Sequence, residues 1–206
     1  MEEWLSGHSL GILALSSFEK QGVPLDIFWQ EAPCSKPTAY KVLIRLGSAG
    51  VLAKDAVSIR TADKGVETFA NDYATNLVNI ATSPVKLLKV SIRVRLHVIV
   101  RAEGEAPKDF SPTGISVLFE HGLEAMRTSY NDYYFNLSGK QRKIGVEEAF
   151  AHALLFEQDS MVLALFLMKN KAKMNIARLR ALARQYGVAE KLATMRDALD
   201  YAEKAV

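Results

Sequence analysis

The stretch CSKPTAYKVLIRLGSAGVL, residues 34–52, holds side chains that could recognise nucleic acid. A helical projection of residues 36–48 places four apolar residues on one face, at the i, i+3, i+4, i+7 spacing that indicates a buried stripe. These residues are Ala39, Val42, Leu43 and Leu46. The opposite face and its flanks carry Pro37, Thr38, Tyr40, Lys41, Ile44, Arg45 and Ser48.

Ser35 precedes this predicted helix, where its hydroxyl is well placed to cap the first turn, and Lys36 lies beside the free end. On a helix in the major groove, cations neutralise phosphates or reach guanine, and hydroxyl groups donate hydrogen bonds. An aliphatic side chain can contact the methyl group of thymine. The residues available for such contacts are Ser35, Lys36, Thr38, Tyr40, Lys41, Ile44 and Arg45.

Two further cations, Lys54 and Arg60, bracket a predicted hairpin that follows this helix. Residues 35–60 contain five Lys/Arg and one acid, Asp55. Residues 1–75 as a whole contain seven Lys/Arg and nine Asp/Glu, a net charge of −2. The positive charge is therefore local, which favours an interface for an anionic partner. Taken alone, the helix is equally compatible with an ordinary solvated face.

The neighbouring elements give the helix its context. We expect a first helix at 9–22 ended by Gly22, a second at 24–32, and a third at about 36–48. Two short strands around a turn are expected within 52–65, followed by a helix with Thr61 as its N-cap. Helix, helix, helix, hairpin and helix within about 75 residues is the plan of a winged helix-turn-helix.

The rest of the chain has a different character. Residues 89–101 alternate apolar and polar side chains, which predicts one half-exposed strand. A loop is expected at 103–114, a helix at 115–127 and a strand at 132–138. Three or four helices follow from Val146, one of them closed by Gly187. The predicted fold class is α+β: an N-terminal winged helix-turn-helix at 1–75, and a larger C-terminal α+β domain at 76–206 that ends in a helical bundle.

The motif SKPTAYKVLIRLGSAGVL followed by IRTADKG resembles the winged-helix transcriptional regulators, over residues 9–70. The resemblance implies sequence-specific binding of double-stranded DNA by a homodimer. It places Ser35, Lys36, Thr38, Tyr40, Lys41 and Arg45 on the recognition helix, and Lys54 and Arg60 on the wing. The same fold also serves in protein–protein and RNA-associated adaptors, in which Tyr40 and Ile44 would contact protein.

The segment from Gly139 to Tyr201 resembles the effector half of the abortive-infection type IV antitoxin regulators. The shared features are QRKI at 141–144, the Glu147-Glu148 pair, and a late helix at 179–187. The chain lacks the Pro-Glu-Arg that the family carries at the positions of 146–148. The resemblance implies an antitoxin-like autorepressor whose residues 76–206 supply dimerisation, effector sensing or binding of a protein partner.

A run of cations has no acid between Asp159 and Glu190: Lys169, Lys171, Lys173, Arg178, Arg180 and Arg184. One interpretation is a second contact for nucleic acid or a docking face for an acidic partner. The other, which we favour, is a solvated helix face. In that case Ile176, Leu179, Ala183 and Tyr186 pack inward.

The amino-acid composition argues against a disordered, disulfide-bonded, secreted or membrane-spanning protein. The apolar fraction of 49% and charged fraction of 24% are those of an ordinary globular protein. Cys34 is the only cysteine, which excludes an intrachain disulfide and favours a reducing, cytoplasmic compartment. The N-terminus is acidic where a secretory signal is positive, and the apolar windows are too short for a membrane span.

Signals for an enzyme are weak. The four histidines form no metal-ligand pair at i, i+4 or HExxH spacing, and no phosphate-binding loop is present. Glu120, His121 and Glu124 are the nearest approach to an acid–base cluster. His152 lies in the apolar run AFAHALLF and is expected to be a hydrogen-bonded core residue. We therefore expect no enzymatic activity and no cofactor.

Overall fold

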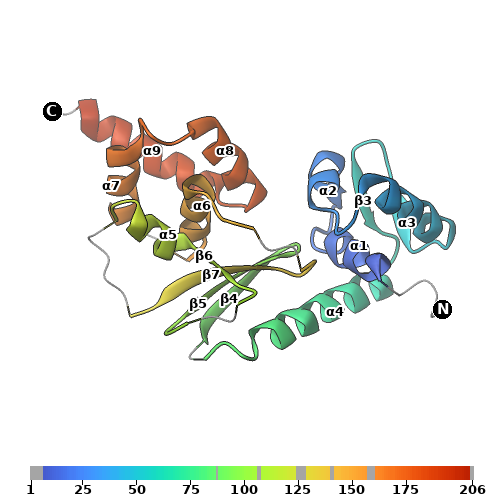
Figure 1. The fold of residues 1–206 in the computed structure, drawn as a ribbon. Coiled ribbons are helices and arrows are strands. Elements are labelled where there is room, and N and C mark those ends of the chain that lie inside the picture. The colour runs from blue at the N-terminus through green and yellow to red at the C-terminus, as the bar shows by residue number, and fades with distance from the viewer. Residues whose placement is uncertain are drawn as a thin grey trace. The chain divides into compact units, whose positions relative to one another are not determined.

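A computed structural model describes residues 7–86, 88–105, 108–123, 129–139, 142–156 and 161–204, with side chains described as far as Asp197. The chain has an α+β fold (Figure 1). Within the described residues it divides into two compact units. The first comprises residues 7–83, 93–98 and 136–139, and the second comprises residues 84–92, 99–135 and 142–204.

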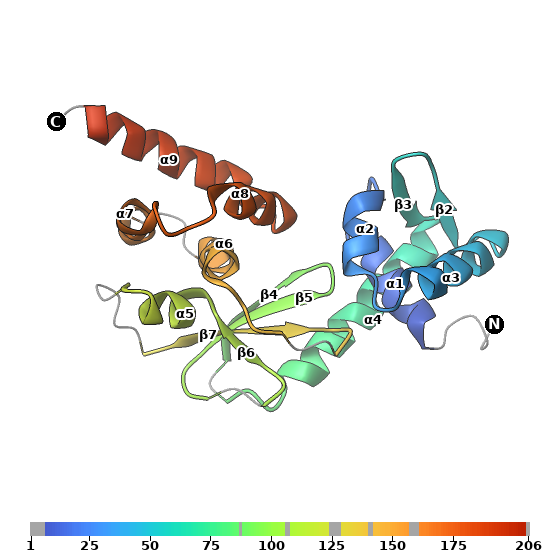
Figure 2. The same ribbon diagram turned by 45° about the horizontal axis from the view of Figure 1, so that its top comes forward.

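The first unit is built from helices around a small antiparallel sheet with the strand order β1-β3-β2. Its elements in chain order are α1 (His8–Ser16), β1 (Val23–Pro24), α2 (Leu25–Glu31), α3 (Lys36–Ser48), β2 (Leu52–Lys54), β3 (Ser58–Thr61) and α4 (Lys64–Thr82). The helices predicted at 24–32 and 36–48 and the hairpin within 52–65 are confirmed. Figure 2 shows α3 beside the β2–β3 hairpin.

The core of the first unit contains the predicted stripe of α3, since Ala39, Val42, Leu43 and Leu46 are all buried. They belong to one cluster with Ile12 and Leu15 of α1, Phe28 of α2 and Ile59 of β3, among others. Fully burying a Val, Leu, Ile or Phe side chain contributes about 1.5–3 kcal/mol. The amphipathic period therefore fixes which face of α3 is left exposed.

The first helix is shorter than predicted, because α1 ends at Ser16 and does not extend to Gly22. The Ser16 hydroxyl donates to the carbonyl of Ile12 at 2.9 Å, and the Ser17 hydroxyl donates to that of Ala14 at 3.3 Å. Such local bonds compete with helix continuation. Gly22, with φ +91°, leads into β1, and a Cβ there would lie 3.0 Å from the Cβ of Arg60.

The helix after the hairpin also starts later than predicted. Asp63, rather than Thr61, is the N-cap of α4, and its side chain accepts from the Val66 amide at 3.0 Å. Thr61 instead ends β3. Because α4 continues to Thr82, residue 75 lies inside this helix.

Residues 89–101 form a hairpin, so the prediction of one strand is wrong. β4 (Leu88–Val94) and β5 (His97–Ala102) flank a turn at which Arg95 has φ +55°. The alternation continues through this turn and therefore does not mark it. β5 is buried along its whole length, so it is not half-exposed.

The second sheet has the order β4-β5-β7-β6, with β6 (Ser111–Thr113) at one edge and β7 (Asn131–Asn136) beside it. The strand predicted at 132–138 is confirmed as β7. β6 lies within the segment expected to be a loop; its edge position admits Pro112, which pairs with Tyr133. The helix predicted at 115–127 is α5 (Gly114–Glu120), and residues 124–128 lie outside the described residues.

Four helices follow in the described part of the chain, as predicted: α6 (Val146–Phe156), α7 (Met161–Asn170), α8 (Ile176–Gln185) and α9 (Ala189–Lys204). Gly187, with φ +71°, follows the end of α8. In both views, α5 to α9 lie on the same side of the second sheet. Among the described residues, every helix is too short or too polar to cross a membrane.

Candidate nucleic-acid interface

The exposed face of α3 carries the residues that the sequence singled out. Tyr40 and Ile44 are 53% and 55% exposed, which is high for side chains of their size. Lys41 is also exposed and makes no ion pair or hydrogen bond with any described residue. Thr38 is half-buried at the side of the helix. The structure thus brings Tyr40, Lys41 and Ile44 onto one open surface.

The start of α3 differs in detail from the prediction. Ser35 occupies the N-cap position, but its hydroxyl makes no capping bond to a backbone amide. Its oxygen lies 2.9 Å from the Thr38 hydroxyl oxygen, and this pairing takes the place of the cap. Lys36 places its Nζ 5.3 Å from the centroid of the Trp29 ring in α2, a cation–π contact.

The Arg45 residue is exposed, but its side chain also contacts another helix. Its guanidinium donates to the hydroxyl of Ser9, a fully buried residue at the start of α1. Arg45 therefore ties the outer side of α3 to α1. A substitution of Arg45 changes both a surface charge and this contact, whereas a substitution of Lys41 changes only the surface charge.

The turn of the β2–β3 hairpin is shaped by Asp55. Its carboxylate accepts from the amides of Val57 at 2.8 Å and Ser58 at 2.7 Å, and from the Ser58 hydroxyl at 3.0 Å. The Val57 amide and then the two Ser58 bonds lower the pKa of Asp55. At the tip, Val57 is 72% exposed. The Asp55 bonds therefore fix the conformation of the turn, and Val57 places an apolar side chain at its exposed tip.

Lys54 and Arg60 do not share a face of this hairpin. Arg60 pairs with Ala53, and Lys54 pairs with Ile59. Directly opposed residues point to the same side, and neighbours along a strand point to opposite sides. Both cations are exposed, but only one of them can share a surface with the open face of α3.

A buried ionic cluster supports the helix that precedes α3, and sequence reasoning did not find it. The Arg95 guanidinium, 3% exposed, makes two bonds of 2.8 Å to Glu31 at the end of α2 and one of 3.0 Å to Glu19. His97 Nε2 lies 3.4 Å from the same Glu31 carboxylate. Burial alone raises the pKa of Glu31, but the hydrogen bonds from His97 and Arg95 outweigh it and lower that pKa to about 2.

The second unit contains a buried polar network around α6. Glu148 accepts from Arg142 at 2.6 Å and from the Tyr186 hydroxyl. Burial raises the pKa of Glu148, but these bonds and the neighbouring His152 outweigh it and lower the pKa. His152, fully buried, has its Nδ1 2.7 Å from the Thr113 hydroxyl, which confirms it as a hydrogen-bonded core residue. The Glu148, His152 and Tyr186 side chains at its centre are closed to solvent, whereas Arg142 is partly exposed and lines an open pocket.

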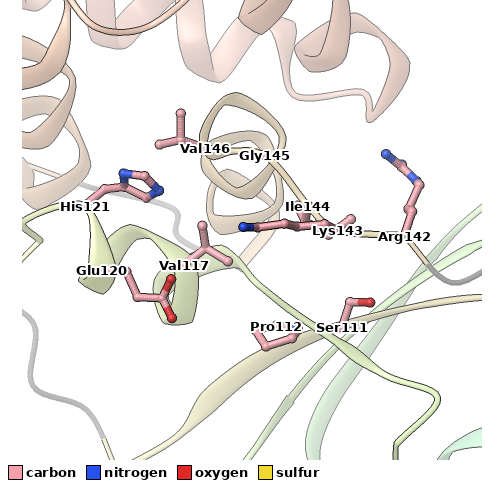
Figure 3. Close-up of a pocket in the computed structure, with 10 residues that line it drawn as sticks. All are labelled: Ser111, Pro112, Val117, Glu120, His121, Arg142, Lys143, Ile144, Gly145 and Val146. Carbon is pink, nitrogen blue, oxygen red and sulfur yellow. The ribbon is translucent and has the colours of Figure 1, made fainter.

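An open pocket of about 1000 Å³ lies beside this network (Figure 3). Glu120 and His121, at the end of α5, and Lys143 line it, and all three are exposed. Glu124, the third member of the predicted acid–base cluster, lies outside the described residues. Among the described residues, no group of three His, Cys, Asp or Glu side chains could hold a metal ion. The described residues that line the pocket offer both charged and apolar side chains to a ligand.

The six cations of the basic run are exposed in the second unit. Leu179, Ala183 and Tyr186 are buried, and Ile176 is half-buried, as the solvated-face interpretation predicts.

No protein-family model, curated protein or solved structure matches the chain. What the protein binds must therefore be inferred from the surfaces described above.

Proposed function

We propose that the first unit is a winged helix-turn-helix that binds double-stranded DNA, and that the protein is a sequence-specific transcriptional regulator. The order α1-β1-α2-α3-β2-β3 and the antiparallel β1-β3-β2 sheet support this arrangement. In it, α3 is the recognition helix and the β2–β3 hairpin is the wing. The N-terminal half of such a helix meets base edges and phosphates in the major groove.

The observation that carries the proposal is the open face of α3. No acidic residue lies between Glu31 and Asp55, so this face offers only cations, hydroxyl groups and apolar groups to a ligand. Lys41 would contact a phosphate or guanine, Tyr40 would donate a hydrogen bond, and Ile44 would contact a thymine methyl group. The half-exposed side chains of Tyr40 and Ile44 beside Lys41 suit a groove better than they suit bulk water.

The proposal extends to a homodimer, because two recognition helices related by a dyad read a pseudo-palindromic site. The resemblance of residues 139–201 to the type IV antitoxin regulators supports an autorepressor whose C-terminal part binds a protein partner or senses an effector. Such a protein would repress its own gene.

We expect the substitution Lys41→Ala to weaken binding of a selected duplex by roughly 3- to 10-fold near 0.15 M salt. It should also reduce the steepness of the log–log salt dependence by about 0.9, because one phosphate contact is lost. Fluorescence anisotropy with the full chain measures both quantities. Lys20→Ala, at an exposed lysine outside α3, is the matched control and should leave both unchanged. If Lys41→Ala behaves like this control, α3 is not the recognition helix.

The second candidate function is a winged-helix adaptor that binds protein. The exposure of Tyr40, Ile44 and Val57 favours it, since all three are apolar or aromatic. The double variant Y40A/I44A distinguishes the two functions. A DNA regulator should lose sequence discrimination but keep salt-dependent binding to random duplexes. An adaptor should show no DNA binding before or after the change.

A further inference from the structure

The open pocket of the second unit is walled by elements that pack against one another. Its lining comes from β6, from α5, and from residues 142–146, which lead into α6 (Figure 3). α5 contacts both α6 and β6, and α6 contacts β6. The fold therefore sets the shape of the pocket, and its volume of about 1000 Å³ is within the range of small-molecule sites.

Several polar side chains line this pocket without a partner. No side-chain hydrogen bond or ion pair to a described residue is made by Ser111, Glu120, His121 or Lys143. Figure 3 shows the Lys143 side chain extending toward the end of α5, where Glu120 and His121 lie. The Lys143 ammonium group and the Glu120 carboxylate nevertheless form no ion pair with each other. The pocket thus offers a ligand one free group of each charge.

The segment that carries Lys143 is anchored on both sides. Arg142, before it, donates to the buried Glu148 at 2.6 Å, so the Arg142 charge is compensated within the protein. Ile144, after it, has a buried side chain. The Lys143 backbone is therefore held in place while its side chain stays free, and a ligand that binds there has little backbone to order.

The wall formed by α5 is fixed in the same way. The His121 amide donates to the Leu118 carbonyl at 3.0 Å, and the Leu118 side chain is fully buried. This turn presents Glu120 and His121 at the end of the helix. Val117 and Pro112 line the pocket beside them and add apolar surface. A ligand would therefore meet fixed charged groups next to an apolar wall.

The charges of the pocket select the kind of ligand. A ligand with negative groups alone would be repelled by Glu120, and one with positive groups alone would be repelled by Lys143. A zwitterion suits both, because its carboxylate accepts from the Lys143 ammonium group and its own ammonium group donates to Glu120. The Ser111 hydroxyl and the His121 imidazole can donate or accept further hydrogen bonds.

We propose that this pocket binds a free amino acid, with the carboxylate of the ligand on Lys143 and its ammonium group on Glu120. The apolar wall would receive the aliphatic part of the ligand. The amino acid would be the effector that the proposed regulator senses. Only this regulatory role rests on the proposed function, since the binding itself requires no DNA.

The test titrates the full chain, without DNA, with the common α-amino acids and with longer ω-amino acids, by isothermal titration calorimetry. We expect at least one of them to bind with a dissociation constant of roughly 10 μM to 1 mM, as a few charge-assisted hydrogen bonds in an open pocket provide. The N-acetyl derivative of that amino acid lacks the positive charge, and its amide lacks the negative charge. Each should bind at least about 10-fold more weakly.

Two substitutions assign the two charges of the ligand to their partners. Lys143→Gln and Glu120→Gln should each weaken binding by at least about 10-fold. Lys143→Gln should also lose the preference for the amino acid over its amide, and Glu120→Gln the preference over the N-acetyl derivative. Lys173→Gln and Glu190→Gln, at exposed residues of the second unit outside the pocket, are the matched controls and should bind as the wild type does. Circular dichroism checks that every variant is folded.

Three results would overturn the proposal. The first is that no amino acid binds at about 10 mM, well above the expected dissociation constant. The second is that binding survives both pocket substitutions or falls equally in the controls. The third is that the N-acetyl derivative binds the wild type as tightly as its parent, which would indicate a site for simple anions. Each result is obtained without DNA, so DNA binding by α3 is decided separately.

Discussion

The substitution Glu31→Gln is expected to lower the free energy of unfolding by about 3–5 kcal/mol. The side chain of Glu31, at the end of α2, is 3% exposed, and its carboxylate accepts two hydrogen bonds from Arg95. Glutamine preserves the shape of the side chain but removes its charge. Of the two carboxylates that bind the Arg95 guanidinium in these contacts, only that of the partly exposed Glu19 then remains. The large loss therefore reflects an undercompensated buried charge rather than the net contribution of the pair. Chemical denaturation followed by circular dichroism measures it.

The same residue predicts how stability depends on pH. The pKa of Glu31 is lowered from 4.5 to about 2 in the folded protein, so its ionised form is stabilised by folding. A lowered pKa contributes stability that is fully present above about pH 4.5 and is lost as the pH falls toward 2. The contribution is on the order of 3 kcal/mol. Between pH 5 and about 2.5, the wild type should therefore lose more stability than Glu31→Gln.

Glu120→Gln, at an exposed carboxylate at the end of α5, is the matched control for both measurements. It should change stability by less than about 0.5 kcal/mol and leave the pH profile as in the wild type. If Glu31→Gln is no more destabilising than this control, the ionic cluster does not hold the hairpin turn to α2. Parallel pH profiles of the wild type and Glu31→Gln would contradict the lowered pKa.

The substitution Asp132→Asn should cost a similar amount, about 3–5 kcal/mol, in the second unit. Asp132 is fully buried, and its carboxylate accepts from Arg101 at 2.7 and 3.0 Å and from the Ile115 amide at 3.0 Å. It therefore joins β7 to β5 and to the start of α5. Asparagine removes the negative charge and leaves Arg101 buried beside the Tyr130 and Phe156 rings.

Two comparisons make this prediction specific. Asp197→Asn, at an exposed aspartate on α9, should leave the free energy of unfolding within about 0.5 kcal/mol of the wild type. The double variant R101M/D132L, which removes both charges, should recover part of the loss, because a buried pair costs desolvation. A double variant less stable than Asp132→Asn would show that the pair itself, rather than the stranded charge, is what stabilises this region.

The position and orientation of α3 were predictable, because both depend on local signals. A proline in the first turn, a 3.6-residue apolar period and a following Gly-rich turn fix the helix bounds and its buried face. The exposure of Tyr40, Lys41 and Ile44 follows directly from that face. The period does not reveal what each exposed side chain contacts, so the bond from Arg45 to Ser9, 36 residues away, was not predicted.

The turn at Arg95 was not predictable from local sequence. It contains no Gly, Pro, Asn or Asp, and the apolar alternation continues through it. The arginine adopts φ +55° while its side chain is bound by Glu31 and Glu19, which lie 64 and 76 residues earlier in the chain. Long-range ion pairs thus accompany a backbone conformation that local propensity disfavours. The continuation of α4 to Thr82 was missed, although no Gly or Pro occurs between Gly65 and Pro84 to mark an earlier end of the helix.

The most direct test of the central claim is the salt dependence of binding between the full chain and a pool of short random-sequence duplexes. Fluorescence anisotropy would follow the affinity from about 50 to 200 mM salt. If α3 and the wing contact DNA through at least three cations, the logarithm of the affinity should fall linearly with the logarithm of the salt concentration, with a slope of about −3 or steeper. No binding near 50 mM salt, or binding that does not change with salt, would contradict the assignment of a DNA-binding regulator.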